Sequence, residues 1–149
     1  MSAELRPKII GARVRRFEDP RLLTGGGAFA DDLGTPGALH VAFRRSDHPH
    51  ARIVGIDCAA ARAMPGIRAI FTGEDLDGLV KPILATSRMR NYHPTPIPVL
   101  ARGKVRYVGE PVVAILGESR YLAEDALEAM EIAYEPLGDV VDPEQAALP

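Results

Sequence analysis

Residues 105–137, VRYVGEPVVAILGESRYLAEDALEAMEIAYEPL, decide the fold of this chain. Within them, residues 112–116 form an unbroken apolar run that starts after Glu110-Pro111 and stops at Gly117. Its length, its flanks and its β-branched residues favour a strand buried on both faces over a segment of helix. The residues before the run predict a short strand and a tight turn. The core is therefore expected around this buried strand.

An amphipathic helix and a final strand are predicted after the buried strand. Ser119 is placed to cap the helix, because its hydroxyl can accept a hydrogen bond from an amide of the first turn. Ile132 and Tyr134 then alternate with Glu131, Ala133 and Glu135, as in a half-buried strand. The strongest burial predictions are Val113, Ile115, Leu122, Ala126 and Met130, the last three on one helical face with Ala129.

The rest of the chain predicts three further strands and one short helix. Strands are expected at residues 37–45, 52–57 and 67–72, and Leu39, Val41 and Phe43 would share one face of the first. A helix over residues 58–64 would follow Asp57 as its cap and stop at Pro65-Gly66. The glycines at 25–27 lack the sequence context of a phosphate loop, so a hairpin turn is the favoured interpretation.

Length and composition predict one soluble domain. The 149 residues suit a single compact unit, which we place at 19–149 behind a basic arm at 1–18. A net charge of −2 favours neither a nucleic-acid nor a membrane-surface partner. The lone cysteine, Cys58, rules out an internal disulfide and fits a reducing compartment. Without an apolar span or a signal-peptide pattern, a cytoplasmic protein is expected.

Two clusters of polar side chains stand out as candidates for binding. Residues 77–103 have no regular periodicity and contain four prolines around Arg88, Arg90, Tyr92 and His93. That loop could clamp an anion, contact an acidic partner or simply be solvated. His48 and His50 flank Pro49, but a zinc site needs a third or fourth ligand, and none has suitable spacing. A surface or interface turn is the favoured interpretation.

Several blocks of the sequence resemble one enzyme family. They are RRFEDPRLLTGGGAFADDL (15–33), RSDHPHARIVGID (45–57), PGIRAIFTGEDL (65–76), VRYVGEPVVAILGES (105–119) and AEDALEAMEIAYEPLGDVVDPEQAAL (123–148). In this order they resemble the N-terminus of molybdenum hydroxylase large subunits, the group of xanthine dehydrogenase, aldehyde oxidase and, most similar here, aerobic carbon monoxide dehydrogenase. The resemblance implies an α+β fold, the α/β-hammerhead, with a mixed β-sheet, two main helices and a long Pro-rich loop.

The resemblance also implies a redox context. In this family molybdopterin, often as its cytosine dinucleotide, hydroxylates a substrate carbon with water, and iron–sulfur clusters and FAD in other components carry electrons away. The family's molybdenum-site residues lie beyond the part that matches this chain. No catalytic, cofactor-binding or metal-binding residue is therefore assigned here, and the isolated chain is expected to be inactive.

The leading hypothesis is a hammerhead portion or split subunit that works beside a molybdenum-binding chain, with iron–sulfur and FAD subunits as further partners. The candidate partner interface comprises Arg15, Arg16, Arg45, His48, His50, Arg88, Arg90, Tyr92 and His93. The alternative is a free-standing, non-catalytic interaction domain, which would expose no large apolar patch. An autonomous enzyme built on Asp47, His48 and His50 would lack a nucleophile–base arrangement.

Overall fold

The computed structural model describes residues 13–148. Most of the predicted arm, residues 1–12, and Pro149 lie outside the described residues. The chain divides after Gly37 into two compact units, and each is treated separately below. The predicted boundary at residue 18 falls inside the first unit.

The first unit contains a short helix, α1 (Asp19–Leu23), and one turn of 3-10 helix, η1 (Ala30–Asp32). The prediction of a hairpin turn at the three glycines is wrong, because they follow α1 and no strand occurs within residues 13–37. Gly25 takes a φ of +75°, and the amide of Gly26 donates to the Arg21 carbonyl over 2.8 Å. The glycines therefore end a helix.

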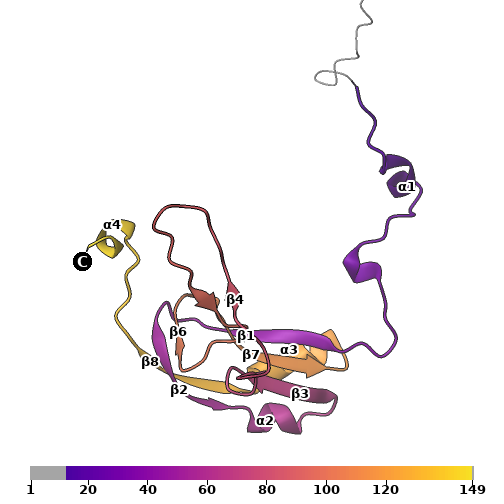
Figure 1. The fold of residues 1–149 in the computed structure, drawn as a ribbon. Helices are drawn as coiled ribbons and strands as arrows, with labels where there is room; N and C mark the ends of the chain where they lie inside the picture. The colour runs from indigo at the N-terminus through magenta and orange to yellow at the C-terminus, as the bar shows by residue number, and fades with distance from the viewer. Residues whose placement is uncertain (1–12, 149) are drawn as a thin grey trace, which may run out of the picture. The chain divides into compact units, whose positions relative to one another are not determined.

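The second unit is built on a three-stranded antiparallel sheet with the order β1-β7-β3 (Figure 1). Its strands are β1 (His40–Arg45), β7 (Pro111–Gly117) and β3 (Ile67–Thr72). The predicted buried strand is the central one, and Val112, Val113 and Ile115 have no exposed surface. A strand that is apolar throughout can take the middle position, because neighbouring strands pair with both its edges.

The two faces of this sheet differ. Ala42, Ile115 and Ile70 lie opposite one another across the three strands and are all buried. Helix α3 (Arg120–Glu128) packs against this face, and α2 (Ala59–Ala63) lies beside β3. The opposite face, which contains Val41 and Phe43, stays open to solvent.

A second antiparallel sheet has the order β6-β2-β8. It consists of β6 (Lys104–Val105), β2 (Ala51–Asp57) and β8 (Glu131–Pro136). The predicted alternation in β8 is confirmed, since Ile132 and Tyr134 are half-buried between exposed neighbours. The pairing of β2 with β8 shifts at Val54, whose side chain is exposed.

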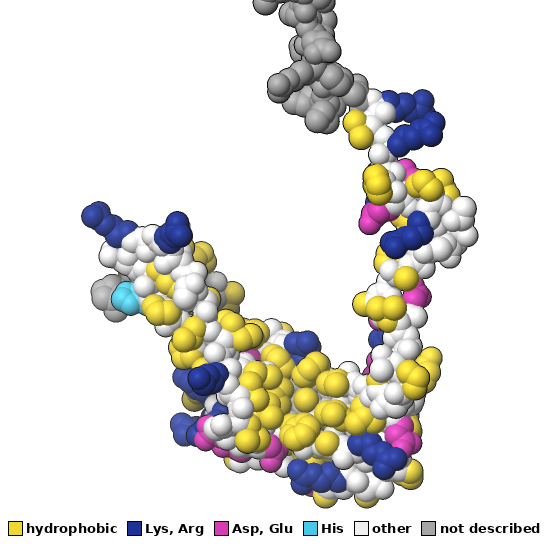
Figure 2. Space-filling view, turned by 45° about the vertical axis from the view of Figure 1, so that its right-hand side comes forward, with side chains coloured by type: hydrophobic (Ala, Val, Ile, Leu, Met, Phe, Trp, Pro, Cys, Tyr) yellow, Lys and Arg dark blue, Asp and Glu magenta, His cyan; other side chains and the backbone are white. Residues whose placement is uncertain are grey.

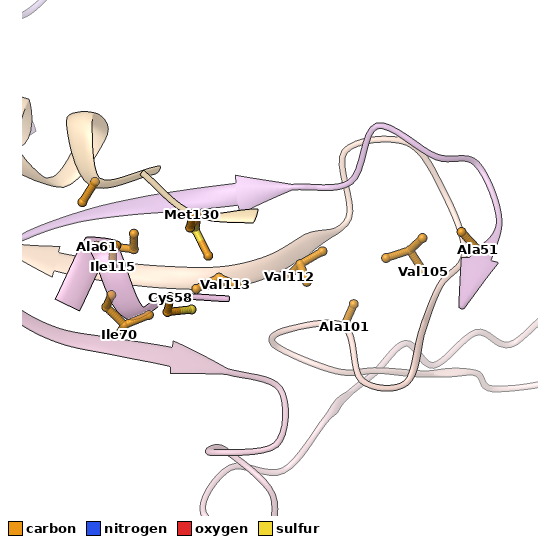
Figure 3. Close-up of a cluster of buried hydrophobic side chains, with 11 residues drawn as sticks. Ala51, Cys58, Ala61, Ile70, Ala101, Val105, Val112, Val113, Ile115 and Met130 are labelled. Atoms are coloured by element: carbon orange, nitrogen blue, oxygen red, sulfur yellow. The ribbon is translucent and has the colours of Figure 1, made fainter. Parts of the chain in front are cut away.

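One hydrophobic core joins the two sheets. Figure 3 shows Val105 and Ala101 at one end, near Val112, and Ile115 and Cys58 at the other. Of the predicted core residues, Val113, Ile115, Ala126 and Met130 are buried, whereas Leu122 is half-buried. The predicted cap is also present, because the Ser119 hydroxyl accepts a hydrogen bond from the Leu122 amide over 3.3 Å.

The predicted α+β class is confirmed, with one correction. Every strand pairing among the described residues is antiparallel, so the prediction of a mixed sheet is wrong in that detail. The connections between paired strands do not need the parallel crossovers that a mixed sheet would contain. The long Pro-rich loop holds only a short hairpin, formed by β4 (Ile83–Leu84) and β5 (Pro96–Ile97).

The chain ends in a short helix, α4 (Pro143–Ala146), capped by the Asp142 carboxylate, which accepts from the Glu144 amide. Within residues 13–148, no helix combines the length and the apolar character that crossing a membrane would require.

Candidate partner interface

The turn that follows β1 is fixed by hydrogen bonds to the turn that precedes β7. Ser46 is buried, and its hydroxyl accepts from the His48 amide and donates to the His48 carbonyl. Its own amide donates to the Glu110 carbonyl, and its carbonyl accepts from the Gly109 amide over 2.8 Å. The Gly-Glu-Pro block therefore holds the 46–50 turn in place.

Glu110 is a buried carboxylate, only 3% exposed. It accepts a hydrogen bond from the Arg106 amide, and the Arg106 guanidinium lies 3.5 Å away. Burial of a charge requires such partners, because an isolated carboxylate would lose its hydration without compensation. Sequence reasoning missed this role, although an acidic residue directly before a buried apolar strand is the signal that could have indicated it.

Among the predicted interface residues, Arg45 is held at the end of β1. Its guanidinium donates to the Gly109 carbonyl over 2.9 Å and lies 5.7 Å from the centre of the Phe43 ring. Part of its hydrogen-bonding capacity is thus used within the domain, while the side chain remains exposed.

His48 and His50 make separate internal contacts. The His48 ring lies against Tyr134, with 4.8 Å between ring centres. The Nδ1 atom of His50 is 2.6 Å from the Gly138 carbonyl oxygen, and its Nε2 atom is 3.4 Å from Lys104 Nζ. A ring nitrogen bonded to a carbonyl must donate, so the neutral ring presents Nε2 as its acceptor. Both residues therefore fasten the turn to β8 and the segment after it.

The Tyr134 hydroxyl is buried and has no hydrogen-bond partner among the described residues. Burial raises the pKa of this phenol, and the nearby Ser46 hydroxyl offsets that effect only in part. Tyr134 is thus a neutral packing side chain near neutral pH.

An open hollow of about 520 Å³ lies beside His50. Tyr107 and Val108 line it from one segment, and Val140 and Val141 line it from another. Among residues 13–148, no three His, Cys, Asp or Glu side chains stand close enough to hold a metal ion. The assignment of no metal ligand to this chain stays a prediction.

The remaining predicted interface residues lie in two other segments. Arg88, Arg90 and His93 are exposed in the loop between β4 and β5, which extends away from the sheets in Figure 1. Tyr92, in the same loop, is half-buried. Arg15 and Arg16 belong to the first unit, where Arg16 lies 3.7 Å from the Asp19 carboxylate. The predicted set is therefore spread over three segments of the chain.

The open face of the β1-β7-β3 sheet is the feature that sequence reasoning did not assign to the interface. Leu39, Val41 and Phe43 were expected to share a face, and they are 42%, 51% and 41% exposed. Figure 2 shows hydrophobic side chains gathered on one side of the unit formed by residues 38–149. Contiguous exposed apolar surface is rare on monomeric proteins, and where it occurs it often marks an interaction site.

Comparison with known proteins decides the family. Residues 24–138 match the profile described as "Aldehyde oxidase and xanthine dehydrogenase, a/b hammerhead domain". The chain belongs to this family. Its fold, read above as α+β from the residues, is that of a molybdenum hydroxylase hammerhead domain, and the family is one of oxidoreductases.

Individual relatives agree with this assignment. The chain is 48% identical over 141 residues to the gamma subunit of the 6-hydroxypseudooxynicotine dehydrogenase complex of Paenarthrobacter nicotinovorans, covering 92% of this chain and 18% of the relative. Quinoline 2-oxidoreductase from Pseudomonas putida 86 has a similar structure, with a TM-score of 0.85 and 44% identity. The match covers 89% of this chain and 17% of the oxidoreductase chain. The structure of a copper- and molybdenum-containing carbon monoxide dehydrogenase has a TM-score of 0.80 and 38% identity. That match covers 91% of this chain and 16% of the dehydrogenase chain.

The coverage is uneven. This chain matches almost along its whole length, yet it spans less than a fifth of the relatives named above. The similarity therefore concerns the hammerhead domain alone.

Proposed function

We propose that this chain is the scaffold portion of a molybdenum-dependent hydroxylase. In this proposal the hammerhead domain is required for structure and assembly, and it lies beside the region that binds the molybdenum cofactor. That region belongs either to a partner chain or to a continuation of this one. The observation that carries the proposal is the match of nearly the whole chain to a domain that makes up 18% of a relative.

The contacts of the polar side chains support a scaffold role. His48 packs on Tyr134, His50 bonds to Gly138, and the Asp47 carboxylate lies 3.7 Å from Arg44. The residues on which an autonomous active site could have been built are thus engaged in holding the turn. Nucleophilic catalysis needs a nucleophile and a base within hydrogen-bonding reach of each other, and these contacts do not provide that pair.

The cofactors of the proposed complex follow from the family. We expect molybdopterin, as its cytosine dinucleotide, in the molybdenum-binding region, and iron–sulfur clusters and FAD in other components. The similarity to a molybdenum-containing carbon monoxide dehydrogenase supports the first of these. The polar residues of the predicted interface, at 15–16, 45–50 and 88–93, are proposed as contacts at the edge of the assembly. The assembly is proposed to lie in the cytoplasm.

The test is purification of the full-length protein from its source cells through an N-terminal tag. Mass spectrometry would identify any chain, or any continuation of this one, that carries the remainder of the relatives, and elemental analysis would measure molybdenum. The proposal predicts molybdenum in proportion to the tagged chain. A stable monomer without molybdenum would contradict it and favour the free-standing interaction domain.

One observation already weighs against that alternative. A free-standing domain is expected to keep large apolar patches out of contact with water. The β1-β7-β3 sheet instead exposes Leu39, Val41 and Phe43 on one face. A domain that permanently packs against another would show this pattern.

A further inference from the structure

We propose that the open face of the β1-β7-β3 sheet is the surface on which the molybdenum-binding region docks. This inference rests on the proposed function, which requires that region to be present, and adds which side of the domain it covers. The face is defined by Val41 and Phe43 of β1, Ala114 and Leu116 of β7, and Ala69 and Phe71 of β3. Val41 and Phe43 are its exposed residues, whereas Leu116, Ala69 and Phe71 are half-buried and Ala114 is buried.

The register of the strands aligns these residues in two rows. Val41 and Ala69 both pair with Leu116, and Phe43 and Phe71 both pair with Ala114. Residues that pair directly across an antiparallel sheet point to the same face. Each row therefore runs across all three strands without a polar or charged side chain.

An antiparallel sheet that ends at solvent would alternate apolar and polar residues along its strands. Here both faces are apolar at the centre of the sheet, because Ala42, Ile115 and Ile70 form an equally apolar row on the face toward α3. A sheet with two apolar faces is a middle layer of a larger structure. The layer over the first face is α3, whereas Val41 and Phe43 on the second face are exposed among the described residues.

The chemistry of the face indicates the occupant. Interfaces that are never exposed during the life of a protein are more hydrophobic than transient ones and resemble a divided core. Aromatic side chains such as Phe43 and Phe71 are enriched in such interfaces, and charges are depleted. In the three relatives named above, the matching part belongs to one long chain and makes up 16–18% of it. The remainder of that chain, which holds the molybdenum site in our proposal, is therefore the permanent neighbour that the face fits.

Site-specific photo-cross-linking tests this inference in the full-length protein. Benzoyl-phenylalanine would replace Val41 in one sample and Val54 in another. Val54 is a matched control, because it is also an exposed valine but belongs to a strand of the other sheet. The exposed fraction is 64% for Val54 and 51% for Val41. Both tagged proteins would be purified from the source cells, irradiated and analysed by peptide mass spectrometry, with molybdenum measured in the same preparations.

Cross-links from position 41 to peptides of the molybdenum-binding region, and only background from position 54, are expected. Molybdenum bound without cross-links from position 41 would overturn this inference and leave the proposed function standing. Cross-links from position 41 to residues 1–37 would assign the face to this chain's own N-terminal segment, and cross-links to a second copy would assign it to a dimer; either result overturns the inference. Absence of molybdenum from both preparations would contradict the proposed function as well.

Discussion

The reactivity of Cys58 is set by burial. Its side chain is 5% exposed and belongs to the core, although it directly precedes α2, a position that can favour a thiolate. Burial raises the pKa of the thiol above its ordinary value of 9.0, and nearby Arg62 opposes this only in part. The neutral thiol is thus the form that the folded state prefers.

Cys58 is therefore expected to react slowly with iodoacetamide at pH 8 in the native protein. The alkylation rate should be at least about ten times lower than in the protein unfolded by urea. The raised pKa also contributes stability that is present below pH 9.0 and is lost as the pH rises through the raised value. Mass spectrometry of time points measures the alkylation. Equal rates in native and unfolded protein would show that the thiol is accessible.

Asp75 illustrates the opposite shift. Its carboxylate accepts hydrogen bonds from the amide and the hydroxyl of Thr72, over 2.7 and 2.8 Å. These bonds favour the charged form and lower the pKa of Asp75 below its ordinary value of 3.8. Stability from this group is accordingly present above pH 3.8 and is lost as the pH falls through the lowered value.

Asp75→Ala should lower the free energy of unfolding by about 1 kcal/mol at pH 7. This loss is smaller than that for a buried charged hydrogen bond, because the Asp75 side chain is exposed. The gap to wild type should close as the pH falls below 3.8. Urea denaturation at pH 7 and at low pH measures both effects. Asp139→Ala, at an exposed position outside the turn, is the control. A gap that stays constant with pH would rule out the carboxylate as the cause.

At the scale of elements, β3 and the segment at 99–103 approach closely at Gly73. A Cβ atom on Gly73 would overlap the Ala101 carbonyl oxygen and lie 3.2 Å from Arg102 Cβ. Ala101 is itself tied to β7, because its amide donates to the Pro111 carbonyl over 2.7 Å. The Ala101 backbone is thus held by β7, and Thr72, next to Gly73, is also paired with β7.

Gly73→Ala is expected to lower the free energy of unfolding by about 2 kcal/mol or more, because neither backbone can move without breaking contacts. Gly55→Ala is the matched control, since a Cβ there meets nothing within 4 Å. Its effect should stay within about 0.5 kcal/mol. Chemical denaturation of the two variants provides the comparison. Similar losses in both would contradict a close approach at Gly73.

The β4–β5 hairpin is the least supported element of the second unit. Its two strands contain two residues each, and the basic residues of its loop are exposed. Such an isolated hairpin is only marginally stable. Within residues 38–148, trypsin should cut first after Arg88 or Arg90, and the fragments should stay together. Time-resolved proteolysis with size-exclusion chromatography tests this. A first cut in β1 or α3 would contradict it.

Elements with local signals could be predicted from the sequence. Residues 112–116 specify a buried strand by composition alone, and Ser119 specifies where α3 begins. Two features could not be predicted, for different reasons. One is the antiparallel pairing of β7 with both β1 and β3, which depends on contacts between distant residues. The other is helix α1 before the glycines, since a helix of five residues is too short to show a 3.6-residue period.

At the scale of the whole molecule, the candidate site shows the same division. His48 and His50 were predicted to lie in a surface or interface turn, and their contacts with Tyr134 and Gly138 show how that turn is held. The open sheet face could not be predicted, although Leu39, Val41 and Phe43 were expected on one side. Alternation shows which residues share a face, but only the position of α3 shows which face is left uncovered.

The central claim is that this domain is a scaffold whose open sheet face holds a molybdenum-binding region. The most direct measurement compares molybdenum per tagged chain in wild type, in Val41→Glu/Phe43→Glu and in the control Val54→Glu, with thermal unfolding to establish that each is folded. Wild type and Val54→Glu should carry the same proportion of molybdenum, and the double variant should lose it by at least about tenfold, because charges would be buried in an apolar interface. A folded double variant that retains its molybdenum, or a wild-type protein without any, would contradict the account.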